Sequence, residues 1–323
     1  MQLFKFKPIL KQTIWGGERI IPFKGLSDEK QNVGESWEIS GVPGDESIVA
    51  DGPEAGMTLP KLVGKYRAEL VGEDNYKRFG FKFPLLIKFI DAKQDLSIQV
   101  HPDDEMAQLR HDSMGKTEMW YVIDAAPGAK LRSGMSQSIT PTEYKDRVMK
   151  NTITDVIQEY DVKQGDVFFL PAGRVHSIGA GCFIAEIQET SNITYRIYDF
   201  DRRGKDGKTR ELHTDLAQKA INYEVLNDYR TKYTVEKNEP IELVACTHFV
   251  TSLYDINEEI TADYSELDSF VIYVCMQGGC TLTNDEGDKT YVEEGESILI
   301  PATAEYIKIV PDKNGVKFLE TYV

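Results

Sequence analysis

An internal repeat limits the folds that this chain can adopt. Residues 162–172 read VKQGDVFFLPA and residues 292–302 read VEEGESILIPA, so the two segments match in register at an offset of 130. Upstream, TEMWYV (117–122) resembles SFVIYV (269–274). Each copy carries a glycine and an acid suited to a turn, then an apolar run suited to a strand, then a proline that ends the strand. We therefore expect two similar β units in tandem.

Short strand-like segments separated by Gly, Pro and Asp occupy most of the remaining sequence. Many short strands at regular spacing favour sandwiches or barrels, so the predicted fold is mainly β. Helical patterns are fewer, and we expect short helices over residues 58–72, 140–150 and 213–226.

The polar stretch 229–242 predicts a domain boundary. It divides the chain into residues 1–235, an N-terminal catalytic unit with helical additions, and residues 236–323, a C-terminal unit. A chain of 323 residues is long enough for two ordinary domains.

Composition excludes several classes of partner. The formal net charge of −16 argues against nucleic acid and anionic membranes, which both require basic surfaces. No stretch approaches the 18 apolar residues of a membrane span. The four cysteines are scattered and form no CxxC motif, which indicates free thiols in a reducing compartment. We therefore expect a cytoplasmic protein whose main partner is neither nucleic acid nor an anionic membrane.

Polar side chains end a strand in the segment SIQVHPDDE (97–105). Because side chains alternate along a strand, Gln99 and His101 share one face while the apolar residues between and before them share the other. Pro102 then stops the strand. Taken alone, two polar groups placed side by side at a strand end are equally compatible with a pair of ligands and with a structural role.

Two further polar residues distinguish the first repeat from the second. Glu118 aligns with Phe270, and His176, which follows LPAGR, aligns with Tyr306. A purely structural role does not require this asymmetry, whereas a site in one copy alone produces it. The aromatic replacements predict a packed, metal-free core in the second unit.

The candidate ligand set contains two imidazoles, a carboxylate and an amide oxygen, and its members are Gln99, His101, Glu118 and His176. Such donors suit a borderline divalent ion, with zinc first. The absence of thiolates favours a catalytic site over a closed structural one.

The remaining histidines have simpler interpretations. Buried histidines are more often satisfied by hydrogen bonds than bound to a metal, and we assign His213 and His248 to that class. His111 lies in a charged stretch and is expected to be exposed.

Several motifs resemble mannose-6-phosphate isomerase, specifically the short bacterial branch of the type I enzymes. They are LSIQVHPDDE, GKTEMWYVI, FFLPAGRVHSIG and ETSNITYRIYDFDR, with WGGERI and GESWEIS nearer the N-terminus. The resemblance runs from about Trp15 to residue 221. It implies two tandem cupin (jelly-roll) domains, one zinc ion per chain, and interconversion of mannose 6-phosphate and fructose 6-phosphate.

The resemblance also implies roles for individual residues. Gln99, His101, Glu118 and His176 match the metal ligands. Arg196 matches an active-site arginine, and Lys88 and Lys116 match lysines that line the pocket. Asn192 stands where the family usually has an aspartate, and an amide cannot serve as a base.

An aldose–ketose isomerase moves a proton between C1 and C2 through an ene-diolate. Arg196 would stabilise the developing negative charge. The base stays open, with Lys116, Glu186, Glu189 and a metal-bound hydroxide as candidates. Lys116 is equally compatible with a solvated lysine on a turn.

The phosphate-binding residues also stay open at this point. Lys88 and Lys93 are candidates, as are the basic residues of the RRGKDGKTR stretch, which are Arg202, Arg203, Lys205, Lys208 and Arg210. Because acids and basic residues mix in this stretch, we interpret it as a solvated hairpin in preference to a phosphate site. Three tryptophans, Trp15, Trp37 and Trp120, are candidates for a sugar pocket, although core packing is the more frequent use of tryptophan.

Two other functions compete with an isomerase. Two histidines and a carboxylate also describe the iron site of an oxygenase, although Gln99 would occupy a position that such an enzyme leaves open. A metal-containing sugar-binding module is the second alternative. It does not require the cations Lys116 and Arg196 beside a Lewis acid.

Overall fold

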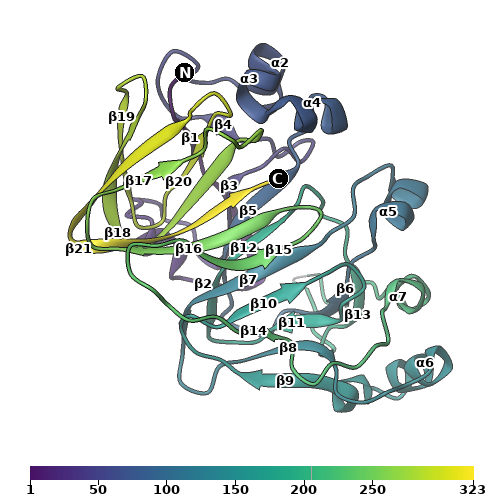
Figure 1. The fold of residues 1–323 in the computed structure, drawn as a ribbon. Helices are drawn as coiled ribbons and strands as arrows, with labels where there is room; N and C mark the ends of the chain where they lie inside the picture. The colour runs from purple at the N-terminus through teal and green to yellow at the C-terminus, as the bar shows by residue number, and fades with distance from the viewer. Residues whose placement is uncertain (205) are drawn as a thin grey trace.

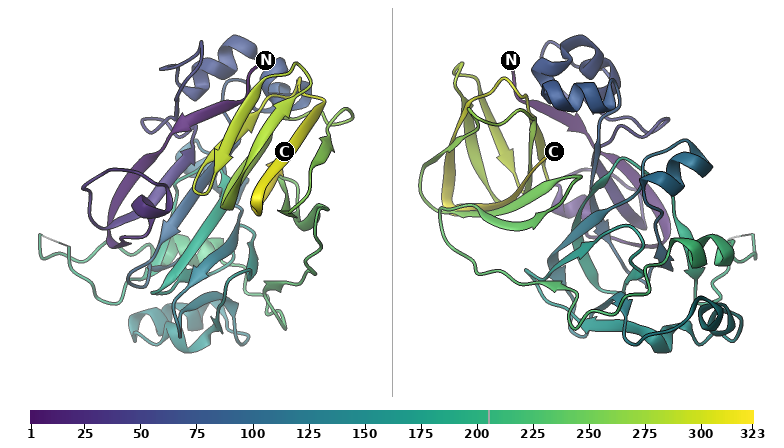
Figure 2. Two further views of the ribbon diagram at one scale, coloured as in Figure 1. Left: turned by 90° about the vertical axis from the view of Figure 1, so that its left-hand side faces the viewer. Right: turned by 45° about the vertical axis from the view of Figure 1, so that its right-hand side comes forward.

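The computed structural model of the chain describes residues 1–204 and 206–323. Strands dominate this part of the chain and form three sheets. Figure 1 shows the C-terminal strands on one side of the molecule and helices α5 (Asp104–His111), α6 (Pro141–Met149) and α7 (Thr214–Ala220) on the other. The right-hand view of Figure 2 shows the same arrangement. The prediction of a mainly β fold with a few short helices is confirmed.

A seven-stranded sheet forms the centre of the molecule. Its order is β14 (Arg230–Thr231), β10 (Val167–Leu170), β7 (Glu118–Ala125), β12 (Cys182–Glu189), β5 (Leu85–Asp91), β3 (Val33–Ile39) and β2 (Ile9–Gly17).

A five-stranded sheet covers one face of the central sheet. Its order is β13 (Tyr195–Tyr198), β6 (Ile98–Val100), β11 (His176–Ile178), β8 (Lys130–Met135) and β9 (Ile157–Asp161). The short 3₁₀ helix η1 (Ile153–Val156) leads into β9.

The third sheet combines C-terminal strands with two N-terminal ones. Its order is β15 (Ile241–Ala245), β16 (Val250–Ile256), β21 (Tyr306–Tyr322), β18 (Val271–Asn284), β20 (Ser297–Ile300), β1 (Phe4–Lys7) and β4 (Ile48–Val49), with β17 (Ile260–Asp263) paired to β21 and β19 (Lys289–Glu293) paired to β18.

Alternation along β7 shows how the sheets pack. Met119 and Tyr121 belong to a core cluster that includes Leu319 of the third sheet, whereas Trp120 belongs to a cluster that includes Leu131 of the five-stranded sheet. Successive side chains of a strand point to opposite faces, so the central sheet has one core on each side. The side facing the five-stranded sheet also carries the polar residues of the candidate site.

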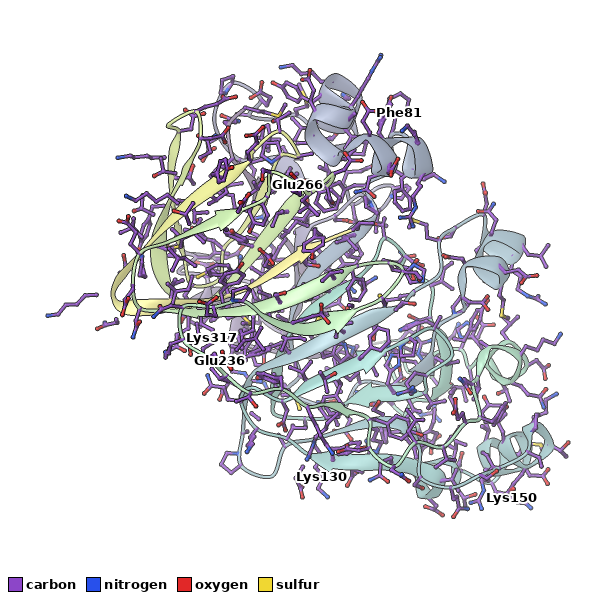
Figure 3. The ribbon with its side chains drawn as sticks, viewed as in Figure 1. Phe81, Lys130, Lys150, Glu236, Glu266 and Lys317 are labelled. Carbon is purple, nitrogen blue, oxygen red and sulfur yellow. The ribbon has the colours of Figure 1, made fainter. Side chains whose placement is uncertain are left out.

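The remaining helices form a group near the N-terminus, visible at the top of Figure 1. They are α2 (Leu59–Tyr66), α3 (Ala68–Val71) and α4 (Glu73–Phe79), while the short α1 (Ile20–Phe23) follows β2. In Figure 3, Phe81 lies beside this group at the periphery, and its side chain is 58% exposed. Among the described residues, none of the helices is both long and apolar enough to pass through a membrane.

The three expected helices have different outcomes. The helix at 140–150 is confirmed as α6, and the Thr140 hydroxyl caps it by accepting a hydrogen bond from the Glu143 N–H at 3.1 Å. The helix at 58–72 is wrong as a single element, because Arg67 has a φ of 52° and separates α2 from α3. The third helix ends at Ala220 and is shorter than 213–226.

The repeat corresponds to two antiparallel strand pairs, β7 with β10 and β18 with β20. Their registers differ by one residue, since Leu170 pairs with Glu118 whereas Ile300 pairs with Val271 and not with Phe270. Phe270 is buried and its ring lies 4.6 Å from that of Phe83. The expectation that both aromatic replacements fill a core is wrong for Tyr306, which is 42% exposed.

Candidate metal centre and pocket

One wall of the site is a row of four residues on neighbouring strands of the central sheet. Trp37 on β3 pairs with Lys88 on β5, which pairs with Glu186 on β12, which pairs with Trp120 on β7. Directly paired residues place their side chains on the same face of a sheet. The row therefore presents two charges of opposite sign between two indole rings.

The opposite wall is a shorter row on the five-stranded sheet. Gln99 on β6 pairs with His176 on β11 on one side and with Arg196 on β13 on the other. His101 follows directly after β6, where Pro102 ends the strand. Glu118 begins β7 and projects from the first wall, so the two sheets bring the predicted ligands together.

His101, Glu118 and His176 converge on one point. The Nε2 atoms of the two histidines are 3.1 Å apart. Glu118 Oε1 lies 3.2 Å from His176 Nε2, and Glu118 Oε2 lies 3.6 Å from His101 Nε2. All three side chains are buried, with at most 1% of each residue exposed.

Hydrogen bonds fix the protonation of both imidazoles. His101 Nδ1 lies 2.8 Å from the Ile193 carbonyl, and His176 Nδ1 lies 2.8 Å from the Arg174 carbonyl. A carbonyl only accepts, so each Nδ1 carries the proton and each Nε2 lone pair points to the common centre. Burial lowers the pKa of His176 to about 3 and that of His101 well below its usual value, which keeps both rings neutral.

This arrangement of donors fits a metal ion. Two lone pairs at 3.1 Å repel each other, and both Glu118 carboxylate oxygens are buried without a hydrogen-bond partner. A buried carboxylate and two inward lone pairs are costly unless a cation balances them. Neutral imidazoles oriented by carbonyls are also the usual form of histidine ligands.

Gln99 and Lys116 complete the surroundings of this centre. The Gln99 amide lies 3.4 Å from His176 Nε2. Lys116 Nζ lies 3.2 Å from His101 Nε2 and 3.2 Å from Glu118 Oε2. Lys116 is only 5% exposed, so its interpretation as a solvated turn residue is wrong.

A pocket of about 170 Å³ opens beside the metal centre. Its lining contains the three tryptophans predicted as candidates for a sugar pocket, Trp15, Trp37 and Trp120. Its polar lining residues are Glu35, Lys88, Ser97, Gln99, Lys116, Glu186, Asn192, Thr194, Arg196 and Arg210. Cations, carboxylates and indole rings suit a polar, anionic ligand with an apolar face.

Lys88 and Glu186 form a buried ion pair in this pocket. Lys88 Nζ is 3.0 Å from Glu186 Oε1, and the Trp120 indole N–H donates to Glu186 Oε2 at 2.7 Å. Burial disfavours the charge on Lys88, but Glu186 and Glu35 together raise its pKa to about 12. Burial likewise disfavours the Glu186 carboxylate, yet the charges of Lys88 and Lys116 lower its pKa below the usual value. Both groups are therefore charged at neutral pH.

The other end of the pocket carries arginines. Arg210 donates from Nε to Asp199 Oδ2 at 2.8 Å and from Nη2 to Oδ1 at 2.5 Å, and Arg202 also pairs with Asp199 at 2.5 Å. Arg196 Nη1 donates to the Glu211 carbonyl at 2.9 Å, while its Nε is buried without a partner. Burial first, and then the charge of Arg210, lowers the pKa of Arg196. Three guanidinium groups and one carboxylate leave a local excess of positive charge.

The interpretation of the basic stretch after β13 as a solvated hairpin is therefore partly wrong. Arg210 lines the pocket, which corrects its interpretation as part of a solvated hairpin, whereas Arg203 and Lys208 are exposed as expected. Lys205 lies outside the described residues. Lys93, the other candidate for phosphate, is exposed and does not line this pocket.

The structure shows which of the candidate bases line the pocket. Glu186 lines the pocket with Lys116, but Glu189 does not, because its carboxylate accepts a hydrogen bond from the Thr117 N–H at 2.7 Å and faces His248. Sequence reasoning missed Thr194 and Asp199. For Thr194 a signal existed, since Asn192, Thr194 and Arg196 alternate along the chain and all three line the pocket.

The remaining histidines have partners other than the metal centre. His213 and His248 are half-buried rather than fully buried. His213 Nδ1 accepts a hydrogen bond from the Arg196 N–H at 3.0 Å. His111 is exposed, as expected, and its Nε2 lies 2.8 Å from the Tyr195 hydroxyl.

Comparisons with known proteins place the chain in a family. A sequence profile described as "Phosphomannose isomerase type I, catalytic domain" matches residues 3–154. Mannose-6-phosphate isomerase ManA from Bacillus subtilis is 32% identical over 300 residues, which cover 92% of this chain and 92% of that protein. The chain belongs to the type I phosphomannose isomerase family.

Further relatives support the assignment of the chain to this family. Mannose-6-phosphate isomerase from Streptococcus mutans is 31% identical over 91% of this chain and 90% of that protein. The crystal structure of the mannose 6-phosphate isomerase from Bacillus subtilis superposes with a TM-score of 0.89 at 28% identity, covering 100% of both chains. The predicted resemblance to type I phosphomannose isomerases is confirmed, and so is the prediction that the chain is an isomerase.

Proposed function

We propose that this phosphomannose isomerase family member is a zinc-dependent enzyme that interconverts mannose 6-phosphate and fructose 6-phosphate through an ene-diolate. The observation that carries the proposal is the convergence of two Nε2 lone pairs and the Glu118 carboxylate beside a cationic pocket. The choice of mannose 6-phosphate as the substrate rests on the relatives that are named as mannose-6-phosphate isomerases.

Zinc held by His101, Glu118, His176 and Gln99 would orient and polarise sugar oxygens without entering redox chemistry. The rest of the chemistry belongs to side chains of the pocket. Arg196 keeps its charge and stabilises the negative charge that develops on the ene-diolate oxygens. Either Lys116 or Glu186 moves the proton between C1 and C2, and Glu186, which is ionised, can accept it as it stands.

The phosphoryl group is best placed at the arginine end of the pocket. The charge of Lys88 is balanced by Glu186 at 3.0 Å, and Lys116 contacts two of the metal ligands. Arg196 and Arg210 also line the pocket, and Arg210 is paired with Asp199 at the pocket wall. We propose that Arg210 takes the phosphoryl oxygens, while Lys88 and Trp37 contact the sugar.

The proposal also assigns different roles to the two parts of the chain. Residues 1–235 would form the catalytic cupin domain, and residues 236–323 a cupin-like domain without a metal site. The four cysteines are free thiols, which is compatible with a reducing cytoplasm.

The test is turnover of mannose 6-phosphate by purified protein, before chelation, after it, and after zinc is added back. We expect activity to disappear with the metal and to return with zinc. An Arg196→Ala variant should lose at least about 100-fold in kcat. Arg203→Ala is the matched control, because Arg203 is exposed and its Nη1 donates to the Gly207 carbonyl. A zinc-loaded protein without turnover would exclude the isomerase.

A further inference from the structure

The segment 115–117 carries Lys116 and leads directly into Glu118. Each of its three N–H groups is held by a partner from elsewhere in the chain. Gly115 N donates to Asp104 Oδ1 at 2.8 Å, Lys116 N donates to the Pro102 carbonyl at 3.1 Å, and Thr117 N donates to Glu189 Oε2 at 2.7 Å. Two of the three acceptors are therefore carboxylates.

Close packing leaves this segment little freedom to shift. A Cβ on Gly115 would lie 2.6 Å from the Asp104 nitrogen, so only glycine allows the approach. Thr117 is also the acceptor of the Glu189 N–H at 3.1 Å, which makes Glu189 bond Thr117 through both its backbone and its side chain.

A histidine from the C-terminal part of the chain faces both carboxylates. His248 Nδ1 lies 3.0 Å from Glu189 Oε1 and 3.9 Å from Asp104 Oδ2. His248 sits in the turn between β15 and β16, which is closed by a hydrogen bond from the Cys246 N–H to the Phe249 carbonyl at 3.0 Å. In Figure 1 this hairpin reaches from the C-terminal strands toward α5, whose first residue is Asp104.

We propose that His248 is a positioning residue through which the C-terminal sheet holds Lys116 and Glu118 in place beside the metal centre. The path runs from His248 to the Glu189 carboxylate, from there to the Thr117 N–H, and along the backbone to the two neighbouring side chains. The proposal rests on the proposed function for the role of the metal centre. The path, an ion-pair contact from His248 to Glu189 followed by a hydrogen bond from the Thr117 N–H to Glu189, does not itself depend on the reaction.

Burial explains why His248 matters for this path. Glu189 is 2% exposed, and an ionised carboxylate at such a position is costly unless it is paired and hydrogen-bonded. Its Oε2 accepts from the Thr117 N–H, and its Oε1, which accepts no hydrogen bond from the described residues, lies 3.0 Å from His248 Nδ1 as an ion-pair contact. Without the imidazole, Glu189 must take up a proton or turn toward water, and either change weakens its hold on Thr117.

The charges around His248 favour its protonated form. Glu189 and Asp104 face it as anions, and the more distant Arg78 opposes them. The hydrogen bond to Glu189 is the largest effect, and the pKa of His248 is raised above its usual value. A charged donor also makes the stronger hydrogen bond to a carboxylate.

The test compares the parent with His248→Ala, His248→Gln and His248→Lys. The first readout is the zinc dissociation constant, measured by competition with a chelator, and the second is kcat and KM for mannose 6-phosphate. We expect His248→Ala to weaken zinc binding by about 10-fold, the lower range for residues that support metal ligands, and to lower kcat more than it raises KM. His248→Lys restores a charged donor and should recover most of the affinity, with His248→Gln between the two.

His111→Ala is the control, because His111 is exposed and lies outside this path. Unchanged zinc affinity in His248→Ala would overturn the proposal, even if the variant unfolds at a lower temperature. Binding of a second zinc ion that His248→Ala abolishes would also overturn it, since His248 would then be a ligand. The zinc dissociation constant can be measured without turnover. A parent protein without isomerase activity would therefore reject the proposed function, while the zinc measurements would still test the role of His248.

Discussion

The Nε2 atoms of His101 and His176 lie 3.1 Å apart although the two residues are separated by 75 positions in the sequence. Each atom carries a lone pair, because each Nδ1 donates its proton to a carbonyl. Lys116 Nζ lies 3.2 Å from both His101 Nε2 and Glu118 Oε2, and a metal ion would balance the remaining lone pair and the carboxylate charge. The fold is therefore expected to depend on the metal, and not only the activity.

Metal removal should lower the thermal stability of this protein. A ligand that binds only the folded state at 100 times its dissociation constant adds about 2.7 kcal/mol to the free energy of unfolding. We expect chelation to lower the melting temperature by several degrees and zinc to restore it. His176→Ala should make the melting temperature insensitive to zinc. Equal melting temperatures of parent protein with and without zinc would contradict this prediction.

The Lys88–Glu186 pair should show strong coupling in a double-mutant cycle. Each group is buried and lies 3.0 Å from the other, so removing one leaves the other without its nearest counter-charge. Lys88→Met alone should cost about 3–5 kcal/mol of unfolding free energy, and Glu186→Gln alone a similar amount. The double variant should be more stable than the sum of the single effects predicts. Additive single effects, measured by urea unfolding, would show that the charges do not interact.

Arg210 should govern recognition of the phosphoryl group. Its guanidinium lines the pocket and is oriented by two hydrogen bonds to Asp199. Arg210→Gln is expected to raise KM for mannose 6-phosphate by at least about 10-fold, since a hydrogen bond to a charged group contributes roughly 1.5–3 kcal/mol. Activity on unphosphorylated mannose, if measurable, should not fall. Arg203→Gln is the control, and an equal effect of the two substitutions would reject this assignment.

The two candidate proton carriers can be separated by isotope exchange. Mannose 6-phosphate labelled with deuterium at C2 loses the label to solvent when a base removes it. Glu186→Gln and Lys116→Met are compared for exchange, zinc content and binding of product. Because Glu186 is ionised, we expect Glu186→Gln to lower exchange by about 100-fold or more while zinc stays bound. Full exchange in Glu186→Gln together with none in zinc-loaded Lys116→Met would assign the base to Lys116 instead.

The sequence predicts a candidate set of metal ligands from strand alternation and from the internal repeat. Strand alternation places Gln99 and His101 on one face, and the comparison of the two repeats singles out Glu118 and His176. The arginine end of the pocket is different, because whether Arg210 faces solvent or the pocket depends on its bonds to Asp199, eleven residues away. The break at Arg67 likewise has no residue signal, since arginine is a good helix former.

His248 shows the limit of such reasoning most clearly. Its proposed role depends on contact between a hairpin turn near residue 248 and a strand end near residue 189, and the turn near residue 248 carries no motif. Pairing across such a distance is decided by how the third sheet packs on the central one. Sequence analysis could assign His248 only to the general class of hydrogen-bonded histidines.

The pH dependence of stability offers a last test of the His248–Glu189 pair. The contact with Glu189 is the main reason why the pKa of His248 is raised, and the charge of Asp104 raises it further. Burial and the charge of Arg78 oppose this shift. A raised pKa in the folded state means that the stabilisation is fully present below the unfolded pKa of about 6.5 and is lost as the pH rises through the folded pKa. In chelated proteins, His248→Gln should therefore be less stable than the parent by on the order of 1 kcal/mol near pH 5.5, with a smaller difference near pH 8.5. Urea unfolding at both pH values measures this difference, and a gap that widens with rising pH would show that the imidazole acts in its neutral form.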